Sequence, residues 1–300
     1  MPPITKRCHW VPQAYLRNFA ADPERRKIWR FSKNQDGGDP ELKPIEKVAV
    51  RFHLYAPKEA ETERRNDSME RKLGSLENFL GQPLWHELSY GYVDLSSEPV
   101  RKMVSLMVAV MQFRNPAHFE MHKAFHRQMV ESISAMGSPP FTYEFQGEKF
   151  RLDADSWVEF RDATEEDLRR TWLADLGSAA WYAKELMAMR WVIVEAKRPT
   201  FVTSDNPVTI IHPSLQFRGL SNPETMVTFP LSPTRLLHLD HRYSEPANVY
   251  YPLIDNGAAQ NLMIWRHATE HMLSSRHPDE VCRDLLDAED LLIANPVREQ

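Results

Sequence analysis

His9, Gln13 and Arg17 are the first residues whose types and spacing suit chemistry. Gln13 and Arg17 lie four residues apart, which places them on one face of a predicted helix, and His9 directly precedes that helix. Histidine changes its charge near neutral pH, so His9 suits a general base, while Gln13 and Arg17 suit the orientation of an anionic group. The alternative interpretation is a buried histidine that holds the N-terminal segment against the core.

Arg114 stands at the end of an apolar helix that is predicted from about residue 97 to 115. A charged side chain is costly to bury there unless it is paired. Arg114 therefore suits the binding of an anion or phosphate in a pocket. The alternative is a structural ion pair with Glu70 or Glu77, which lie on a helix predicted over residues 61–80.

Asp205 and Asn206 follow one β-type run and precede another. Polar groups at strand ends often face a ligand cleft, so Asp205 suits a base or a metal ligand, and Asn206 suits substrate binding. The alternative is structural, because Asp and Asn side chains also bond to nearby backbone and set the geometry of a turn.

His267, Glu270 and His271 have the spacing H-x-x-E-H, which is the inverted form of a zinc-protease pattern. A helix predicted from about Asn256 to Ser275 would carry them. The pattern is short and arises readily by chance in a chain with 12 histidines. We therefore assign no metal ligands, and we leave the cofactor undefined.

His118, His122 and His126 recur every four residues on another predicted helix. Two histidines at this spacing can bind zinc, but three in a row on a straight helix cannot all reach one ion. The pattern favours a solvent-exposed, weakly basic helix face.

The composition of the 300-residue chain excludes several classes of protein. Two cysteines make neither a disulfide framework nor a zinc cage, and ten glycines disfavour a glycine-rich phosphate loop. The formal net charge of −5 does not favour a nucleic acid as partner, although a small anionic ligand remains compatible with a local basic site. No apolar run approaches the ~20 residues of a membrane helix, and no signal region is visible, so we expect a cytoplasmic protein without a membrane partner.

Helical patterns fill most of the chain before about residue 190, and β-type runs follow. These runs are Trp191–Ala196, Thr200–Thr203, Val208–Ile211, Met226–Phe229 and Leu236–Leu239. The predicted fold is α+β and helix-dominated, with several long helices around a small antiparallel sheet of four or five strands at about residues 190–240. We expect a single domain over residues 1–300, in which a helical part (1–190) packs with the sheet (191–240) and with C-terminal helices (255–293).

Five segments of the chain carry a family resemblance. They are His9–Phe19 (HWVPQAYLRNF), Met69–Glu77 with its two glutamates, Gln112–Pro116 (QFRNP), Phe201–Val208 (FVTSDNPV) and Phe229–Pro233 (FPLSP). In order and spacing they resemble the domain of unknown function 4238 family, which is known from bacterial and fungal genomes. Trp10 departs from the pattern, since tyrosine is more usual there. The resemblance implies a shared fold and no particular activity.

Three functional hypotheses follow from these residues. In the first, His9, Arg114 and Asp205 act as base, cation and carboxylate in the hydrolysis of an anionic ester, such as a phosphodiester. In the second, the same groups bind a small anion or nucleotide without turnover. In the third, every motif is structural. The combination of charge with expected burial favours the first two.

Overall fold

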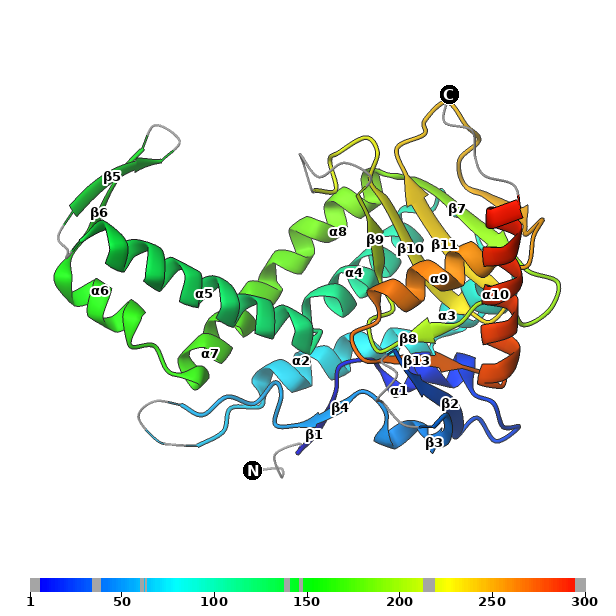
Figure 1. Ribbon diagram of the computed structural model, residues 1–300, viewed down its shortest axis with the longest axis horizontal. Helices are drawn as coiled ribbons and strands as arrows, with labels where there is room; N and C mark the ends of the chain where they lie inside the picture. The colour runs from blue at the N-terminus through cyan, green and yellow to red at the C-terminus, as the bar shows by residue number, and fades with distance from the viewer. Residues whose placement is uncertain are drawn as a thin grey trace.

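Buried apolar strands from the second half of the chain build the main sheet (Figure 1). The structure, a computed structural model, describes residues 6–33, 39–59, 62, 64–137, 141–145, 148–212 and 219–294. Within this part of the chain the sheet has the order β12-β7-β11-β10-β9. Its strands are β7 (Arg190–Glu195), β9 (Thr209–Ile211), β10 (Met226–Ser232), β11 (Arg235–Asp240) and β12 (Val249–Pro252). Neighbouring strands are antiparallel except β12 and β7, which are parallel.

The prediction of a small sheet near residues 190–240 is confirmed in outline and wrong in two details. Four of the predicted runs form β7, β9, β10 and β11. The run at 200–203 instead ends in β8 (Thr203–Ser204), which belongs to a second sheet, and β12 extends the main sheet beyond residue 240 with a parallel pairing. Alternating apolar residues identify a strand, but its partner depends on contacts that are distant in sequence.

The second sheet joins segments from the two ends of the chain, in the order β3-β2-β13-β8. Its strands are β2 (Lys27–Ser32), β3 (Glu41–Pro44), β8 and β13 (His271–Ser274). All of its pairs are antiparallel, and Met272 of β13 lies between Phe31 and Ser204. A separate ribbon pairs β1 (Arg7–His9) with β4 (Val50–Phe52).

The helix predicted from 256 to 275 is wrong in its second half. The helix α9 (Ala258–His267) ends at His267, and His271 begins β13. Met272 and Leu273 are fully buried in the second sheet, and this burial decides between helix and strand for a short apolar run. The pattern H-x-x-E-H therefore does not lie on one helix.

The helix α4 (Glu98–Phe113) lies at the centre of the body, as its apolar sequence predicted. Most of its residues from Val104 to Met111 are buried, and it packs along α8 (Ala179–Ala188). The remaining helices of the body are α1 (Gln13–Leu16), α2 (Ser68–Glu77), α3 (Pro83–Tyr90) and α10 (Pro278–Ala294), with short 3-10 turns between them.

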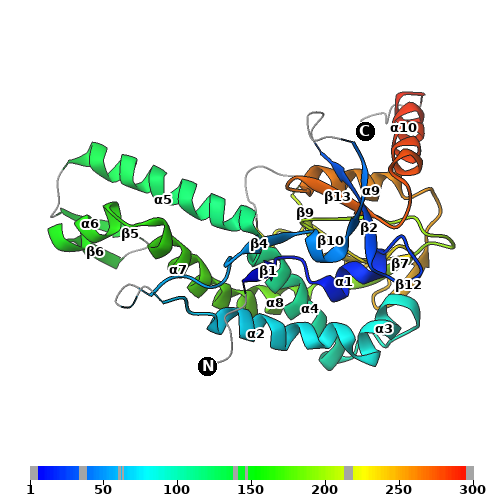
Figure 2. The same cartoon turned by 90° about the horizontal axis from the view of Figure 1, so that it is seen from below.

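An arm of helices projects from the body (Figures 1 and 2). It consists of α5 (Pro116–Met136), the hairpin β5 (Phe141–Phe145) and β6 (Glu148–Leu152), α6 (Ala154–Arg161) and α7 (Glu165–Asp175). The sequence predicts a hairpin over residues 141–152 with its turn at Gln146 and Gly147; the pairing of β5 with β6 confirms its strands, and the two turn residues lie outside the described residues. The sequence also predicts one helical region up to Met189, which the structure divides into α6, α7 and α8. Thr164 causes the first break, because its side chain caps α7 in a capping box with Asp167. Within the described residues, no helix has the length and apolar character to cross a membrane.

Candidate functional site

His9 lies at the end of β1, and its ring has a partner on each nitrogen. Its Nε2 lies 3.1 Å from the Glu46 carbonyl oxygen, and its Nδ1 lies 3.4 Å from Gln13 Nε2. Since a carbonyl only accepts, Nε2–H donates to Glu46 and Nδ1 accepts from Gln13. Burial lowers the pKa of His9, and the charges of Arg7 and Arg114 act in the same direction. The imidazole is therefore neutral at neutral pH, with its lone pair toward Gln13.

Gln13 and Arg17 line a groove of about 430 Å³ that also contains the backbone partner of His9. The groove runs between α1, the turn before β2 and the 3-10 turn η2 (Ile45–Lys47). We call it the basic groove, and its polar lining residues are Gln13, Arg17, Arg25, Arg26, Lys27 and Glu46. A second pocket of about 520 Å³ shares Arg17, Arg25 and Arg26 with the groove and adds the acidic Glu24, so the same three cations line both hollows.

Arg25 is held in place by an unusual backbone conformation. Its φ of 56° lies in the left-handed region, which non-glycine residues rarely adopt. Asp22 stabilises this turn, because its carboxylate accepts the backbone N–H groups of Arg26 (2.9 Å) and Lys27 (2.6 Å). The Arg25 guanidinium is fixed in turn by Asn18 Oδ1 at 2.8 Å. Strained and over-determined residues of this kind gather at functional sites.

Arg114 is buried and fully engaged with protein groups. Its guanidinium forms an ion pair with Glu77 at 2.7 Å and donates to the carbonyl of His9. It also lies over the ring of Tyr55, whose hydroxyl donates to the Arg114 carbonyl. Burial raises the pKa of Glu70, the other predicted partner, although the charge of Arg114 opposes that shift. The side chain of Arg114 is thus adjacent to His9 but has its donors directed at the protein.

Asp205 is 2% exposed and holds the segment that leads into β13. Its carboxylate accepts three backbone N–H groups, from Thr269 (2.8 Å), Glu270 (2.8 Å) and His271 (3.1 Å). Asp205 lines a small pocket together with Trp10, whereas Gln13 and Arg17 line the basic groove.

Asn206 and His267 make contacts of a structural kind. Asn206 Nδ2 donates to the His267 carbonyl at 2.8 Å. Both ring nitrogens of His267 lie 2.9 Å from backbone carbonyl oxygens, those of Met263 and Ile210. Both ring nitrogens of His267 are thus directed at backbone carbonyl groups, and His267 does not belong to the metal-ligand set that the described residues form.

Among the described residues, one group of side chains could hold a metal ion, namely Asp205, Glu270 and His271. Their candidate ligand atoms lie within 4.8 Å of one another. They line a small pocket of about 210 Å³, and cationic side chains line the same pocket, namely Arg30, Lys47 and Arg51. Three cations beside two carboxylates oppose the entry of a divalent ion. Since Asp205 already accepts three hydrogen bonds, we do not assign a metal site here.

Buried hydrogen bonds connect several of the five segments that resemble the family. The Tyr15 hydroxyl contacts Thr203 Oγ1 and donates to the Pro230 carbonyl, both at 2.8 Å. Trp10 Nε1 donates to the Asp205 carbonyl at 2.7 Å. The first segment is thereby tied to both β-rich segments. The same contacts fix α1, which carries Gln13, and the following 3-10 turn, which begins at Arg17, relative to the sheets.

Sequence reasoning missed Arg25, Arg26 and Lys27 as members of a site. The available signal was three cationic residues in succession after the turn at Asp22. The alternating run Lys27–Ser32 (KIWRFS) predicts a strand, so the pattern indicates Lys27 only as the start of that strand. That interpretation is confirmed by β2, but the exposed side chain of Lys27 also faces the groove.

Comparison with known proteins places the chain in a family whose function is not established. A search among curated proteins and one among solved structures gave no significant match. The family model described as "Protein of unknown function (DUF4238)" matches residues 7–277, a span that includes all five resembling segments. The chain therefore belongs to the DUF4238 family.

Proposed function

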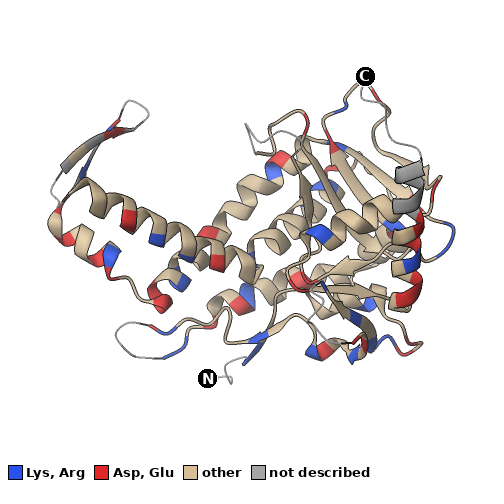
Figure 3. Ribbon diagram, in the orientation of Figure 1, with Lys and Arg blue, Asp and Glu red and all other residues tan. Residues whose placement is uncertain are grey.

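We propose that the protein binds a small anionic ligand of the phosphate-ester class in the basic groove. The convergence of Arg17, Arg25, Arg26 and Lys27 on one groove carries this proposal, since the whole chain has a net charge of −5. Charges of both signs are otherwise mixed over the body and the arm (Figure 3). Glu46 is the one acidic residue among the described residues that line the groove.

The free donors in the groove suit an anion. The side chains of Arg17, Arg26 and Lys27 are exposed and make no hydrogen bond or ion pair with the described residues. Guanidinium groups match phosphate oxygens with two parallel hydrogen bonds, and such charge-assisted bonds are stronger than neutral ones. Arg25 needs little further ordering because Asn18 already fixes it.

Thermal unfolding in the presence of inorganic phosphate tests the proposal. A ligand that binds only the folded state raises Tm with its concentration. Arg17→Gln and Arg26→Gln should each weaken binding by about fivefold to tenfold, which corresponds to the loss of one charge-assisted hydrogen bond. Arg283→Gln, an exposed residue of α10, removes the same charge outside the groove and should bind as the wild type does. Equal weakening in all three variants, or no phosphate-dependent rise in Tm, rejects the proposal.

A second candidate function is hydrolysis of the bound ester with His9 as general base. The specific observation in its favour is a neutral imidazole whose lone pair has only a long 3.4 Å contact with Gln13, a lining residue of the groove, so that an attacking water can replace Gln13 as the hydrogen donor to His9. Bis(p-nitrophenyl) phosphate is a suitable chromogenic substrate. His9→Gln should abolish turnover and retain phosphate binding, whereas unchanged turnover contradicts this role. Asp205→Asn is expected to act on stability first, because its carboxylate holds backbone groups.

A further inference from the structure

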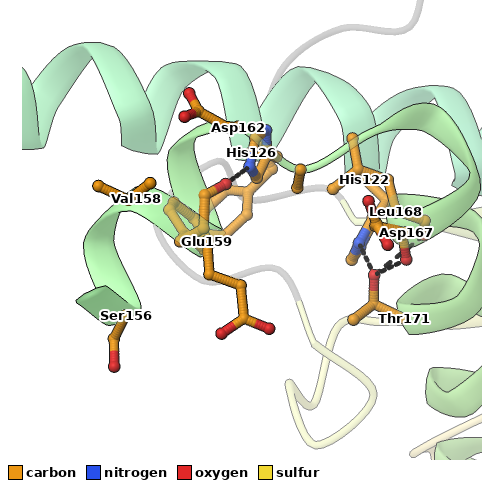
Figure 4. Close-up of a pocket in the computed structure, with 12 residues that line it drawn as sticks. His122, His126, Ser156, Val158, Glu159, Asp162, Asp167, Leu168 and Thr171 are labelled. Atoms are coloured by element: carbon orange, nitrogen blue, oxygen red, sulfur yellow. Dashed lines mark hydrogen bonds between the residues drawn. The ribbon is translucent and has the colours of Figure 1, made fainter. Parts of the chain in front are cut away.

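The arm contains a pocket of its own, of about 640 Å³, between α5, α6 and α7 (Figure 4). Apolar side chains from all three helices line it, namely Phe125, Val158, Phe160 and Leu168. Phe125 is 60% exposed and Val158 is 47% exposed, so these walls are open to solvent. A concave apolar site of this size is typical of small-molecule pockets.

The two histidines of the pocket have structural contacts. His126 Nε2 lies 2.7 Å from the Phe160 carbonyl oxygen, and its ring packs against the Phe160 ring. His122 Nε2 lies 3.3 Å from Thr171 Oγ1. These bonds, dashed in Figure 4, join α5 to the end of α6 and to α7 and keep the pocket walls in place.

The charged residues that line the pocket are all acidic. Asp162 pairs with Arg161 through two bonds of 2.8 Å, and Asp167 pairs with Arg170. Glu159 makes no hydrogen bond or ion pair with any side chain that the structure describes, and Figure 4 shows its carboxylate reaching out from α6. The pocket therefore offers one unpaired negative charge beside aromatic rings.

We propose that this pocket binds an apolar molecule that carries a single ammonium group. The apolar walls would remove the body of the ligand from water, and the Glu159 carboxylate would pair with the cation. The exposed ring of Phe125 adds a second attraction, because the face of an aromatic ring favours a cation. The proposal is independent of the basic groove, which lies in the body and selects the opposite charge.

Calorimetric titration with three matched naphthalene compounds tests the charge preference. The probes are 1-naphthylmethylamine, 1-naphthalenemethanol and 1-naphthoate, which share one ring system and differ in charge. The amine should bind the wild type about threefold to fivefold more tightly than the alcohol, as expected for a solvent-accessible ion pair, and the naphthoate should bind most weakly. Glu159→Gln should remove this preference and leave the affinity for the alcohol unchanged.

Two further variants distinguish binding in the pocket from a general effect of the protein's charge or of its exposed surface. Glu131→Gln removes a negative charge from an exposed position of α5 that does not line the pocket, and it should retain the preference for the amine. Phe125→Ser should weaken the amine and the alcohol together, because it removes part of the apolar wall. Absence of binding, equal affinity for the three compounds, or a preference that survives Glu159→Gln overturns the proposal.

Discussion

Arg114 illustrates how a single buried charge can organise a site without being part of it. The guanidinium is 1% exposed, and each of its bonds connects a different segment of the chain: Glu77 of α2, the carbonyl of His9, and Tyr55. Removal of one partner from such a buried pair leaves the other charge without compensation. The position of His9 beside the groove therefore depends on Arg114.

Arg114→Met is expected to lower the free energy of unfolding by about 3–5 kcal/mol, since it leaves Glu77 and the His9 carbonyl without their donor. The double variant Arg114→Met/Glu77→Gln should cost less than the sum of the two single changes. Urea denaturation measures all three values. Arg161→Met breaks an exposed ion pair and should cost less than about 1 kcal/mol, so an equally small effect at Arg114 would contradict the ion-pair account.

The lowered pKa of His9 predicts a specific dependence of stability on pH. The folded state takes up a proton at this ring less readily than the unfolded state, in which the pKa is about 6.5. The contribution of neutral His9 to the free energy of unfolding is therefore fully present above pH ~6.5. It is lost as the pH falls from there through the lower pKa of the folded state. In urea titrations at pH 7.5 and 5.0, His9→Gln should lose less stability on acidification than the wild type. His277→Gln removes an exposed ring and serves as the control, and a His9 variant as acid-sensitive as that control would disprove the assignment.

At the scale of elements, the end of α9 shows why part of the fold was not predictable. The residues after His267 continue an apolar helical period, so sequence alone extends the helix to residue 275. In the structure, Asp205 accepts the N–H groups of residues 269–271, and β13 pairs with β2 and β8. These partners come from segments about 65 and 240 residues away, and a local pattern contains no information about them.

Two glycines in different elements should respond in opposite directions to substitution by alanine. Gly74 lies within α2, and an added Cβ would meet no atom within 4 Å, so Gly74→Ala should stabilise the protein by about 0.5–1 kcal/mol. Gly257 precedes α9 with a φ of +70°, and an added Cβ would lie 2.7 Å from Thr200 Cγ2. Gly257→Ala should therefore destabilise the protein by more than 1 kcal/mol. Denaturant midpoints compare the two, and shifts of the same sign would contradict the packing around Gly257.

For the whole molecule, local patterns predicted the mixed helical and β architecture, the central helix α4 and most strands of the main sheet. They did not predict the second sheet, because its strands β2 and β13 stand at opposite ends of the chain. The candidate site shows the same division. The helical spacing predicts Gln13 and Arg17 as neighbours, and both line the basic groove, whereas Arg25 joins them only through a turn whose left-handed backbone has no clear sequence signal.

Deletion of β13 should abolish the folding of the body. A chain that ends at residue 270 lacks the strand between β2 and β8, and we expect no cooperative thermal transition by circular dichroism. A chain that ends at residue 277 retains β13 and loses α10 with its buried Val281, so it should unfold cooperatively at a lower temperature. Cooperative unfolding of the shorter chain would show that the second sheet is dispensable.

The pairing of β2 with β13 also has a consequence for the nascent chain. On the ribosome, β13 emerges about 240 residues after β2, which at ~5–20 residues per second takes on the order of 10–50 s. For that interval one edge of β2 has unpaired amide and carbonyl groups, and such an edge can pair with other chains. Synthesis of β13 closes that edge, so protection of β2 by a chaperone or by the preceding segments should raise the yield of folded protein.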